Sequence, residues 1–428
     1  MRAKAVFTLL CRVLLIALCG FAVWRSIRIA IADWLASAGT IDGFERAARF
    51  APDNAELLAR EAMYRNGNGD LSPAVDQDLR RAARLNPLDS AVLMTLGLRE
   101  EFRGNSTKAE GYLVRAAEID HQFKPAWTLA NYYYRANQPD KGWPMIRRML
   151  SLEPLTFDPA PVFELCWNQT TDAHRILSLI PKRGHRPIQY LEFLIKTRRT
   201  DAALDVFPEA LVAADPADSS DIGTLTGFTD FLAGADRMPE AVTVWNRLVE
   251  RGILHSGRLD PAKGISIADP DFKFTALPRT FGWRMAEIPG VFASWSSGSL
   301  RFEISGDEPQ SFQVLSVFAP VLASRPYHLV WKSDGSSLNS PQDPGFRFQI
   351  VQQRTLQQTG EGATQCPPLL SPGKPVCDFI APAPVELGHS GPGSITRVRI
   401  DLGYTRAQGT TRVSGTLQLF NARLELAR

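Results

Sequence analysis

The sequence lacks the residue clusters on which most catalytic centres are built. Its 428 residues include only six histidines, which are scattered, and no HExxH, GxSxG, P-loop or CxxC motif occurs. Metal-dependent hydrolysis, serine-hydrolase chemistry, P-loop nucleotide binding and a zinc or redox CxxC site therefore have no motif to support them. We expect a non-enzymatic protein that uses no metal or other cofactor.

An excess of charge of one sign is also absent. Lysine and arginine number 48 against 45 aspartates and glutamates, which gives a net charge of +3. A surface that binds nucleic acid or polyphosphate needs a clearer basic excess. We therefore exclude nucleic acid as a partner.

Long apolar runs are missing except near the N-terminus. The run from Val13 to Trp24 is unbroken and extends back to Ala5 if Arg12 is tolerated near one end. These residues, 5–24, match the length of about twenty that a bilayer crossing requires. Basic residues flank the run on both sides: Arg2, Lys4 and Arg12 precede it, and Arg25 and Arg28 follow it. The positive-inside rule then favours a cytoplasmic N-terminus by a small margin.

We interpret residues 1–28 as a cytoplasmic tip and an uncleaved transmembrane signal anchor. Two alternatives remain open. Ala36-Ser37-Ala38 resembles a signal-peptide cleavage site, although it lies about a dozen residues beyond the apolar run. The run could also be a buried helix of a soluble protein.

Cysteine is scarce, and the five copies fall into two groups. Cys11 and Cys19 belong to the apolar run, and Cys166 lies in a helical stretch. Cys366 and Cys377 bracket a proline-rich segment and could form a disulfide, which would indicate an oxidising compartment. Their spacing also fits two unpaired cysteines in a loop.

An internal repeat runs from about residue 30 to 255. Alanine-rich helical ends close at Pro52, Pro87, His121 and Pro154, so the intervals are 35, 34 and 33 residues. Bulky and small residues recur at matching positions of the first helix of a unit: Leu93 and Leu96-Gly97 in one unit, and Ala126, Leu129 and Ala130 in the next. The pattern resembles the tetratricopeptide repeat (TPR), whose period is about 34 residues. That resemblance implies about seven antiparallel helix pairs, stacked into a solenoid whose concave face binds peptides or proteins.

An aromatic cluster in the array is the candidate partner-binding surface. Its members are Trp127, Asn131, Tyr132, Tyr133, Tyr134 and Arg135. Tyrosine and arginine are enriched at binding hot spots, but consecutive helical positions point in different directions, so part of the cluster must pack inward. Trp143, Trp167 and Trp245 are expected in the core between helices.

The composition changes after Gly252, where proline, glycine, serine and alternating apolar residues replace the alanine-rich helices. The candidate strands are Gly282–Met285, Ser299–Ile304, Phe312–Val317, Tyr327–Lys332, Phe346–Val351, Ile395–Asp401 and Thr411–Glu425. Strands without long helices predict an antiparallel β-sandwich.

The order of features in this part resembles the jelly-roll, carbohydrate-binding-module-like domains of the galactose-binding superfamily. The resemblance is carried by Phe281-Gly282-Trp283, by the strand 300–306 and by the long final strand 416–426. It implies glycan binding on exposed aromatics, for which Trp295, Tyr327, Trp331 and Tyr404 are the candidates. A structural or protein-binding role is the alternative, because several of these aromatics could be core residues.

The whole chain is thus expected to be a multidomain α-then-β protein. Residues 1–28 form the anchor, 29–256 the TPR-like α-solenoid and 257–428 the sandwich. This architecture resembles the membrane-anchored repeat proteins that accompany bacterial exopolysaccharide or cell-surface polysaccharide export. It implies a single-pass protein of the bacterial inner membrane with its body in the periplasm, acting as a scaffold for protein partners and in contact with polysaccharide. The alternatives are a glycan-binding receptor and a glycan-active enzyme.

Overall fold

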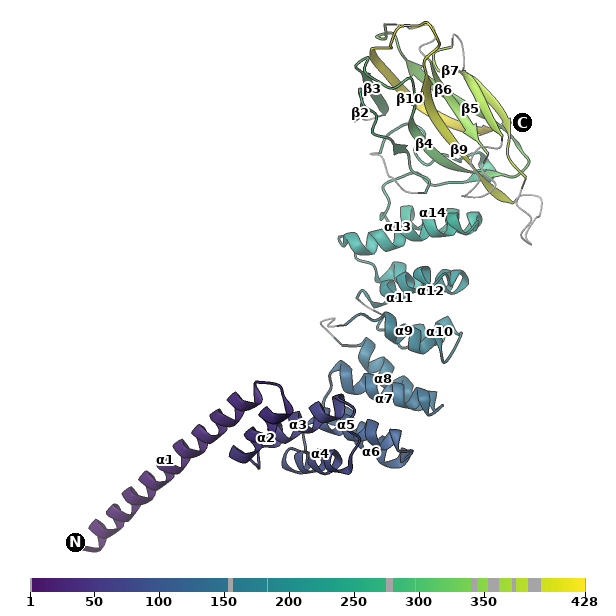
Figure 1. Cartoon of the computed structure of the whole chain (residues 1–428). Helices are drawn as coiled ribbons and strands as arrows, with labels where there is room; N and C mark the ends of the chain where they lie inside the picture. Colours follow the sequence, from purple (N-terminus) through teal and green to yellow (C-terminus); the bar gives the residue numbers. More distant parts are fainter. Residues whose placement is uncertain are drawn as a thin grey trace. The chain divides into compact units, whose positions relative to one another are not determined.

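The computed structural model describes residues 2–152, 157–182, 184–274, 280–296, 298–339, 345–352, 362–371, 375–383 and 394–427. The chain divides by its contacts into two compact units, Met1–Pro181 and Lys182–Arg428. In the residues described, the regular elements of unit 1 are helices, whereas unit 2 has four α-helices followed by the strands of two β-sheets (Figure 1). The predicted order, a helical array followed by an antiparallel sandwich, is confirmed.

Unit 1 is built from consecutive helices, most of which pack in pairs. Pairs α1/α2, α3/α4, α5/α6 and α7/α8 make the main helix–helix contacts. The helices are α1 (Arg2–Ala36), α2 (Ile41–Phe50), α3 (Ala55–Gly67), α4 (Pro73–Leu85), α5 (Ser90–Phe102), α6 (Ser106–Ile119), α7 (Phe123–Arg135), α8 (Pro139–Leu150), α9 (Ala160–Trp167) and α10 (Ala173–Leu177).

Asparagine and aspartate side chains fix where several helices start. Asn54 accepts hydrogen bonds from the backbone of Glu56 and Leu57 at the start of α3, and Asp89 does the same for α5. These acceptors satisfy backbone N–H groups that have no partner inside a helix. The N-caps therefore fix the first residues of these helices through local contacts.

The turn inside each hairpin uses a left-handed residue at an equivalent position. Gly104 (φ 79°) joins α5 to α6, and Asn137 (φ 54°) joins α7 to α8. Glycine adopts this conformation without strain, and asparagine tolerates it better than most residues. These two residues therefore let the chain reverse direction between the helices of each pair.

Gly97 explains the Leu-Gly pair that the repeat pattern singled out. A Cβ atom at Gly97 would lie 2.7 Å from the Leu113 side chain and 3.3 Å from the Ala109 carbonyl oxygen. A larger residue would push α6 away from α5. The small residue is therefore required for the close packing of this hairpin.

Unit 2 begins with two more hairpins and continues into the sandwich. Its helices are α11 (Arg186–Lys196), α12 (Thr200–Ala213), α13 (Ser219–Gly234) and α14 (Met238–Glu250), and a short 3₁₀ turn η1 (Pro261–Lys263) follows. Composition predicted a boundary at 256/257, whereas the contacts place α11–α14 in the same unit as the sheets.

The sandwich consists of two five-stranded antiparallel sheets. One sheet has the order β1-β4-β9-β6-β7 and the other β2-β3-β10-β5-β8. The strands are β1 (Arg284–Met285), β2 (Val291–Ser296), β3 (Ser299–Ile304), β4 (Ser311–Leu322), β5 (Pro326–Asp334), β6 (Phe346–Val351), β7 (Ala363–Pro368), β8 (Val376–Ile380), β9 (Ile395–Thr405) and β10 (Gly415–Leu426). Strand β10 lies between β3 and β5 and is therefore the central strand of the second sheet. The strands β2, β7 and β8 were not predicted.

Polar and aromatic contacts join α13 and α14 to the sandwich within unit 2. The buried Arg397 of β9 donates a hydrogen bond of 2.7 Å to the Ala233 carbonyl at the end of α13. The Trp245 indole of α14 lies edge-on to Phe281, with ring centroids 5.5 Å apart. The last hairpin therefore contacts the β-domain directly through these residues. Trp245 and Trp143 are buried as expected, and Trp167 is half-buried.

Candidate functional site

The tyrosines of the predicted partner surface on α7 divide between the core and the surface. Tyr132 and Tyr133 are buried, and their hydroxyls donate to the Ser106 carbonyl (3.0 Å) and to Glu110 Oε1 (3.1 Å). Burial and the neighbouring Glu110 raise the pKa of Tyr133 to about 12. These two tyrosines hold α7 against α6, so assigning them to a partner surface was wrong. Sequence spacing cannot tell which of three consecutive tyrosines faces inward.

The remaining members of that cluster lie on or near the surface. Tyr134 is 40% exposed, while Trp127 and Asn131 are half-buried. Arg135 donates two hydrogen bonds, of 2.8 and 2.9 Å, to the carboxylate of Glu101 on α5. This charge is therefore engaged, and the bridge connects the exposed end of α7 to α5.

An apolar groove that the sequence did not predict lies beside α5. It has a volume of about 350 Å³ and is lined by Asn66, Leu71, Thr95, Leu98, Arg99, Phe102 and Arg103. Its apolar side chains are unusually open, because Leu71 is 53% exposed, Leu98 43% and Phe102 76%. We call this surface the α5 groove. Exposed apolar groups that gather in a hollow typically mark an interaction site.

A buried ion pair forms the floor of the α5 groove. Arg99 donates to Asp76 Oδ1 (2.5 Å), to Asn66 Oδ1 (2.7 Å) and to the carbonyls of Asp70 (3.0 Å) and Ser72 (3.2 Å). Arg103 also donates to the Asp76 carboxylate. Burial alone raises the pKa of Asp76, but the hydrogen bonds from Arg99 and Arg103 outweigh burial and leave that pKa below its ordinary value. The polar floor is thus paired internally, and the surface it offers to a ligand is apolar.

Three of the four aromatics predicted to bind glycan lie in the sandwich core. Tyr327, Trp331 and Tyr404 are all at most 2% exposed. The Tyr327 hydroxyl accepts a hydrogen bond from the Leu322 backbone N–H at 2.9 Å. Alternate strand positions face the core, and these three occupy the inward positions. Their assignment as sugar-stacking platforms was wrong, and only the half-buried Trp295 keeps part of its surface open.

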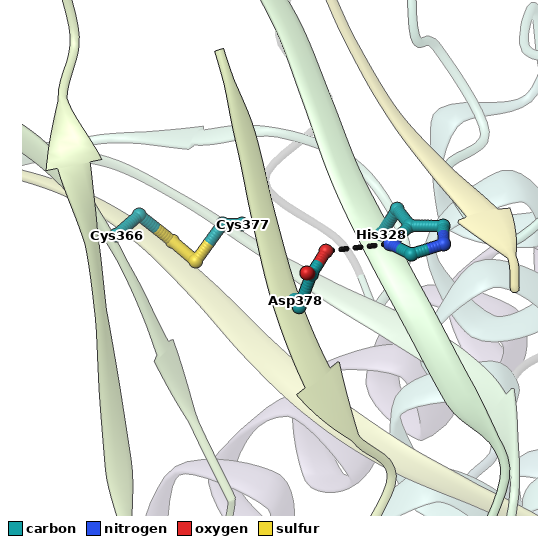
Figure 2. Close-up of a disulfide and its surroundings, with 4 residues drawn as sticks. All are labelled: His328, Cys366, Cys377 and Asp378. Atoms are coloured by element: carbon teal, nitrogen blue, oxygen red, sulfur yellow. Dashed lines mark hydrogen bonds and ion pairs between the residues drawn. A yellow bond between two sulfur atoms is a disulfide. The ribbon is translucent and has the colours of Figure 1, made fainter.

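The structure joins Cys366 of β7 to Cys377 of β8 by a disulfide (Figure 2). Strand β7 is at the edge of one sheet and β8 is at the edge of the other, so the bond connects the two sheets. Next to it, on the outer face of the second sheet, His328 Nδ1 lies 2.6 Å from Asp378 Oδ1 (Figure 2). The disulfide therefore closes one side of the sandwich.

A polar pocket of about 790 Å³ lies between β5 and the disulfide-closed segment. The Trp331 indole N–H and the Ser333 hydroxyl both donate to the Leu369 carbonyl, at 3.0 and 2.8 Å, and fix this wall. Charged and polar side chains are among the residues that line the pocket: His328, Lys332, Asp334, Asn421 and Glu425. The pocket suits a polar ligand, and Leu369, Leu370 and Ser371 line the part of it that lies next to the disulfide.

Removing this disulfide is expected to destabilise unit 2. The two cysteines are 11 residues apart in sequence, and the chain-entropy model assigns a loop of this size about 3 kcal/mol. The variant Cys366→Ser with Cys377→Ser should unfold at lower denaturant concentration than the wild-type chain. Denaturation with and without a reductant measures the effect. The reductant should lower the denaturation midpoint of the wild type and leave that of the variant unchanged. Equal midpoints of the two proteins without reductant would contradict the prediction.

One group in the described residues has metal-ligand chemistry. His185, Asp218 and Asp221 gather at the start of α13, with His185 Nδ1 lying 3.0 Å from Asp221 Oδ1. The hydrogen bond that the His185 ring donates to the Asp221 carboxylate raises the pKa of His185. The carboxylates also accept backbone hydrogen bonds, Asp218 as the N-cap of α13 and Asp221 from Asp215 N–H. These contacts explain the group as a helix start.

The chain is similar to solved helical-repeat structures at low sequence identity. No family model matches the sequence, and no curated protein matches it. YrrB, a TPR protein with an unusual peptide-binding site, is 13% identical (TM-score 0.25), and the match covers 50% of this chain and 95% of that one. MamA is 16% identical (TM-score 0.30; 41% and 94% covered), and pilF of Pseudomonas aeruginosa is 12% identical (TM-score 0.27; 54% and 93% covered). The repeat fold is therefore assigned from the hairpins, the period and the turns of this chain.

Proposed function

We propose that this chain is a non-enzymatic, membrane-anchored scaffold whose α5 groove holds an apolar side chain of a partner protein. The observation that carries the proposal is the exposure of Phe102, Leu98 and Leu71 around one hollow in the helical array. Solvent-exposed phenylalanine costs free energy unless a partner covers it. An apolar anchor that enters such a hollow is the usual core of a binding hot spot.

The charges around the groove support an apolar anchor over an ionic one. Both arginines that line the groove, Arg99 and Arg103, are paired with Asp76. A charged partner residue would have to break one of these pairs. A partner leucine, methionine or aromatic residue would displace only water from the groove.

The replacement Phe102→Ala is expected to raise the Kd for the partner about 30-fold, because truncation of a hot-spot residue costs about 2 kcal/mol or more. The partner would first be captured by cross-linking to the wild-type chain in its own membrane and identified by mass spectrometry. The purified partner would then be titrated against the wild-type and variant full-length chains.

Leu88→Ala is the matched control. Leu88 is 67% exposed in the same unit but does not line the groove. We expect its Kd to equal that of the wild type. If both substitutions weaken binding equally, or neither does, the partner does not occupy the groove.

Helix α1 supports the anchoring part of the proposal. Its segment Cys11–Ala36 has a mean hydropathy of 1.8, and it is the one helix in the described residues that is long and apolar enough to cross a membrane. A signal sequence has the same properties. The disulfide of the sandwich favours an oxidising compartment for the body, which fits the periplasmic side of a bacterial inner membrane.

A role in exopolysaccharide or cell-surface polysaccharide export is the finer part of the proposal. It rests on the combination of an apolar N-terminal helix, a TPR-like array and a sandwich in one chain. The pocket beside the disulfide and Trp295 are the sites that we propose for polysaccharide contact. The other three aromatic candidates are buried in the core. A glycan-binding receptor is therefore a weaker alternative than a protein scaffold, and a glycan-active enzyme is weaker still.

A further inference from the structure

Helix α1 belongs both to the apolar N-terminal run and to the first repeat. It is one helix of 35 residues, Arg2–Ala36. Its last turns pack against the next helices, because Ala32 and Ala36 are buried in a cluster with Phe44, Ala47 and Leu57. No break separates the part that could cross a bilayer from the part that folds with the array.

This continuity fixes the depth of the residues that follow the apolar run. A helix rises about 1.5 Å per residue, so residues 5–24 span about the 30 Å of a hydrocarbon core. If α1 is the proposed anchor, Arg25 and Arg28 lie at the level of the lipid headgroups, next to Trp24. Tryptophan and arginine are typical of that level of the bilayer.

A cavity of about 400 Å³ opens at this level, which we call the juxtamembrane cavity. Trp24, Arg25, Arg28 and Ile29 of α1 line one side, and residues 50–55 line the other. The Arg28 guanidinium lies 4.7 Å from the centre of the Trp24 ring and donates a hydrogen bond of 3.4 Å to the Arg49 carbonyl. The ring and the carbonyl hold Arg28 in place without neutralising it.

The positive charge at this cavity is unbalanced. Asp53 is the one carboxylate among the lining residues, and its Oδ1 already accepts a hydrogen bond of 3.0 Å from Arg81. In the described part of the chain, no carboxylate lies within ion-pair distance of Arg25 or Arg28. Two arginines beside an aromatic ring at the edge of an apolar helix match the phosphate and the upper acyl chain of a lipid.

We propose that the juxtamembrane cavity binds the phosphate of an anionic phospholipid in the leaflet on the body side of the membrane. Arg25 and Arg28 donate to the phosphate oxygens, and the acyl chains lie along the apolar face of α1. This assignment rests on the proposed anchoring of α1. It adds a lipid contact that holds the first repeat at a fixed height above the bilayer.

The test uses the full-length chain in nanodiscs that contain phosphatidylcholine with a minority of phosphatidylglycerol. Native mass spectrometry of the released protein counts the lipids that stay bound. The wild type should retain phosphatidylglycerol in preference to phosphatidylcholine, and Arg25→Gln with Arg28→Gln should lower that preference about 30-fold. The control Arg84→Gln with Arg147→Gln removes the same charge from exposed positions of unit 1 and should leave the preference unchanged.

Three outcomes would overturn the proposal. The first is equal lipid preference in the Arg25/Arg28 variant and the wild type. The second is binding of inorganic phosphate to the detergent-solubilised chain as tightly as phosphatidylglycerol, which would indicate a site for a free anion. Extraction of the wild-type chain from membranes by alkaline carbonate is the third, and it alone also refutes the proposed anchor.

Discussion

Replacing Asp76 with alanine is expected to lower the free energy of unfolding of unit 1 by about 3–5 kcal/mol, the range for removing one partner of a buried ion pair. Asp76 and Arg99 are both buried, and Asp76 also accepts from Arg103. The alanine variant would leave the Arg99 guanidinium buried without its counter-charge. The hydrogen bonds to Asn66 and to two carbonyls cannot replace that charge.

This loss is measured by unfolding the full-length chain in denaturant. Protease cleavage within unit 1 reports the fraction of that unit that is unfolded at each denaturant concentration. Asp78→Ala is the matched control, because Asp78 lies on the same helix and makes a half-exposed pair with Arg65 at 3.5 Å. The control should cost less than about 1 kcal/mol. If the two substitutions lower the free energy of unfolding by similar amounts, the buried pair stabilises the unit no more than the half-exposed pair does.

The same carboxylate predicts a pH dependence. The pKa of Asp76 is lowered in the folded chain from an ordinary value of 3.8. Its contribution to the free energy of unfolding is therefore complete at neutral pH. The contribution is lost as the pH falls through the folded-state pKa, because the unfolded chain binds the proton first. The difference in the free energy of unfolding between the wild type and Asp76→Ala should therefore become smaller below about pH 4.

Trp245→Ala is expected to have an equally large effect in unit 2, about 4 kcal/mol, as for other large aromatic side chains removed from a core. Trp245 is fully buried, and its indole N–H donates to the Gly257 carbonyl at 3.1 Å. Its ring also packs on Phe281. The substitution therefore opens a cavity and removes a hydrogen bond between α14 and the segment that leads into the sandwich.

The unfolding of the β-sheets reports whether this helix supports the sandwich. Trp245→Phe keeps most of the packing and loses the hydrogen bond, so it should cost about 1–2 kcal/mol through that loss and the smaller ring. Trp295→Ala removes a half-buried tryptophan from β2 and should cost less than Trp245→Ala. Sheets that melt at an unchanged denaturant concentration in Trp245→Ala would show that α14 and the sandwich unfold independently.

The repeat array could be predicted because its signals are local. Contacts between neighbouring helices account for three features of the array. These are the interval of 33 to 35 residues, the turns at Gly104 and Asn137, and the small residue at Gly97. The α5 groove could not be predicted, because Leu98 and Phe102 look like ordinary apolar helix positions. Only the packed hairpins show that these side chains are left outside the core.

The sandwich was harder to predict for two reasons. Successive residues of a strand point to opposite faces of the sheet, but the sequence does not say which face is buried. Tyr327, Trp331 and Tyr404 were therefore assigned to the exposed face, whereas they are buried. Strands β7 and β8 flank a proline-rich segment, and proline argues against strand in a local pattern. The cysteines at 366 and 377 were the only sign that these segments lie side by side.

If α1 is the anchor proposed above, its unbroken length gives unit 1 a defined orientation around the membrane normal. Because an α-helix turns by about 100° per residue, the number of residues between Trp24 and Ala32 sets the direction in which the α5 groove faces around the membrane normal. Adding one residue there would rotate the whole of unit 1 by about a quarter turn. A partner embedded in the same membrane would then meet the groove from only one side, a geometric selectivity that a flexible tether could not provide.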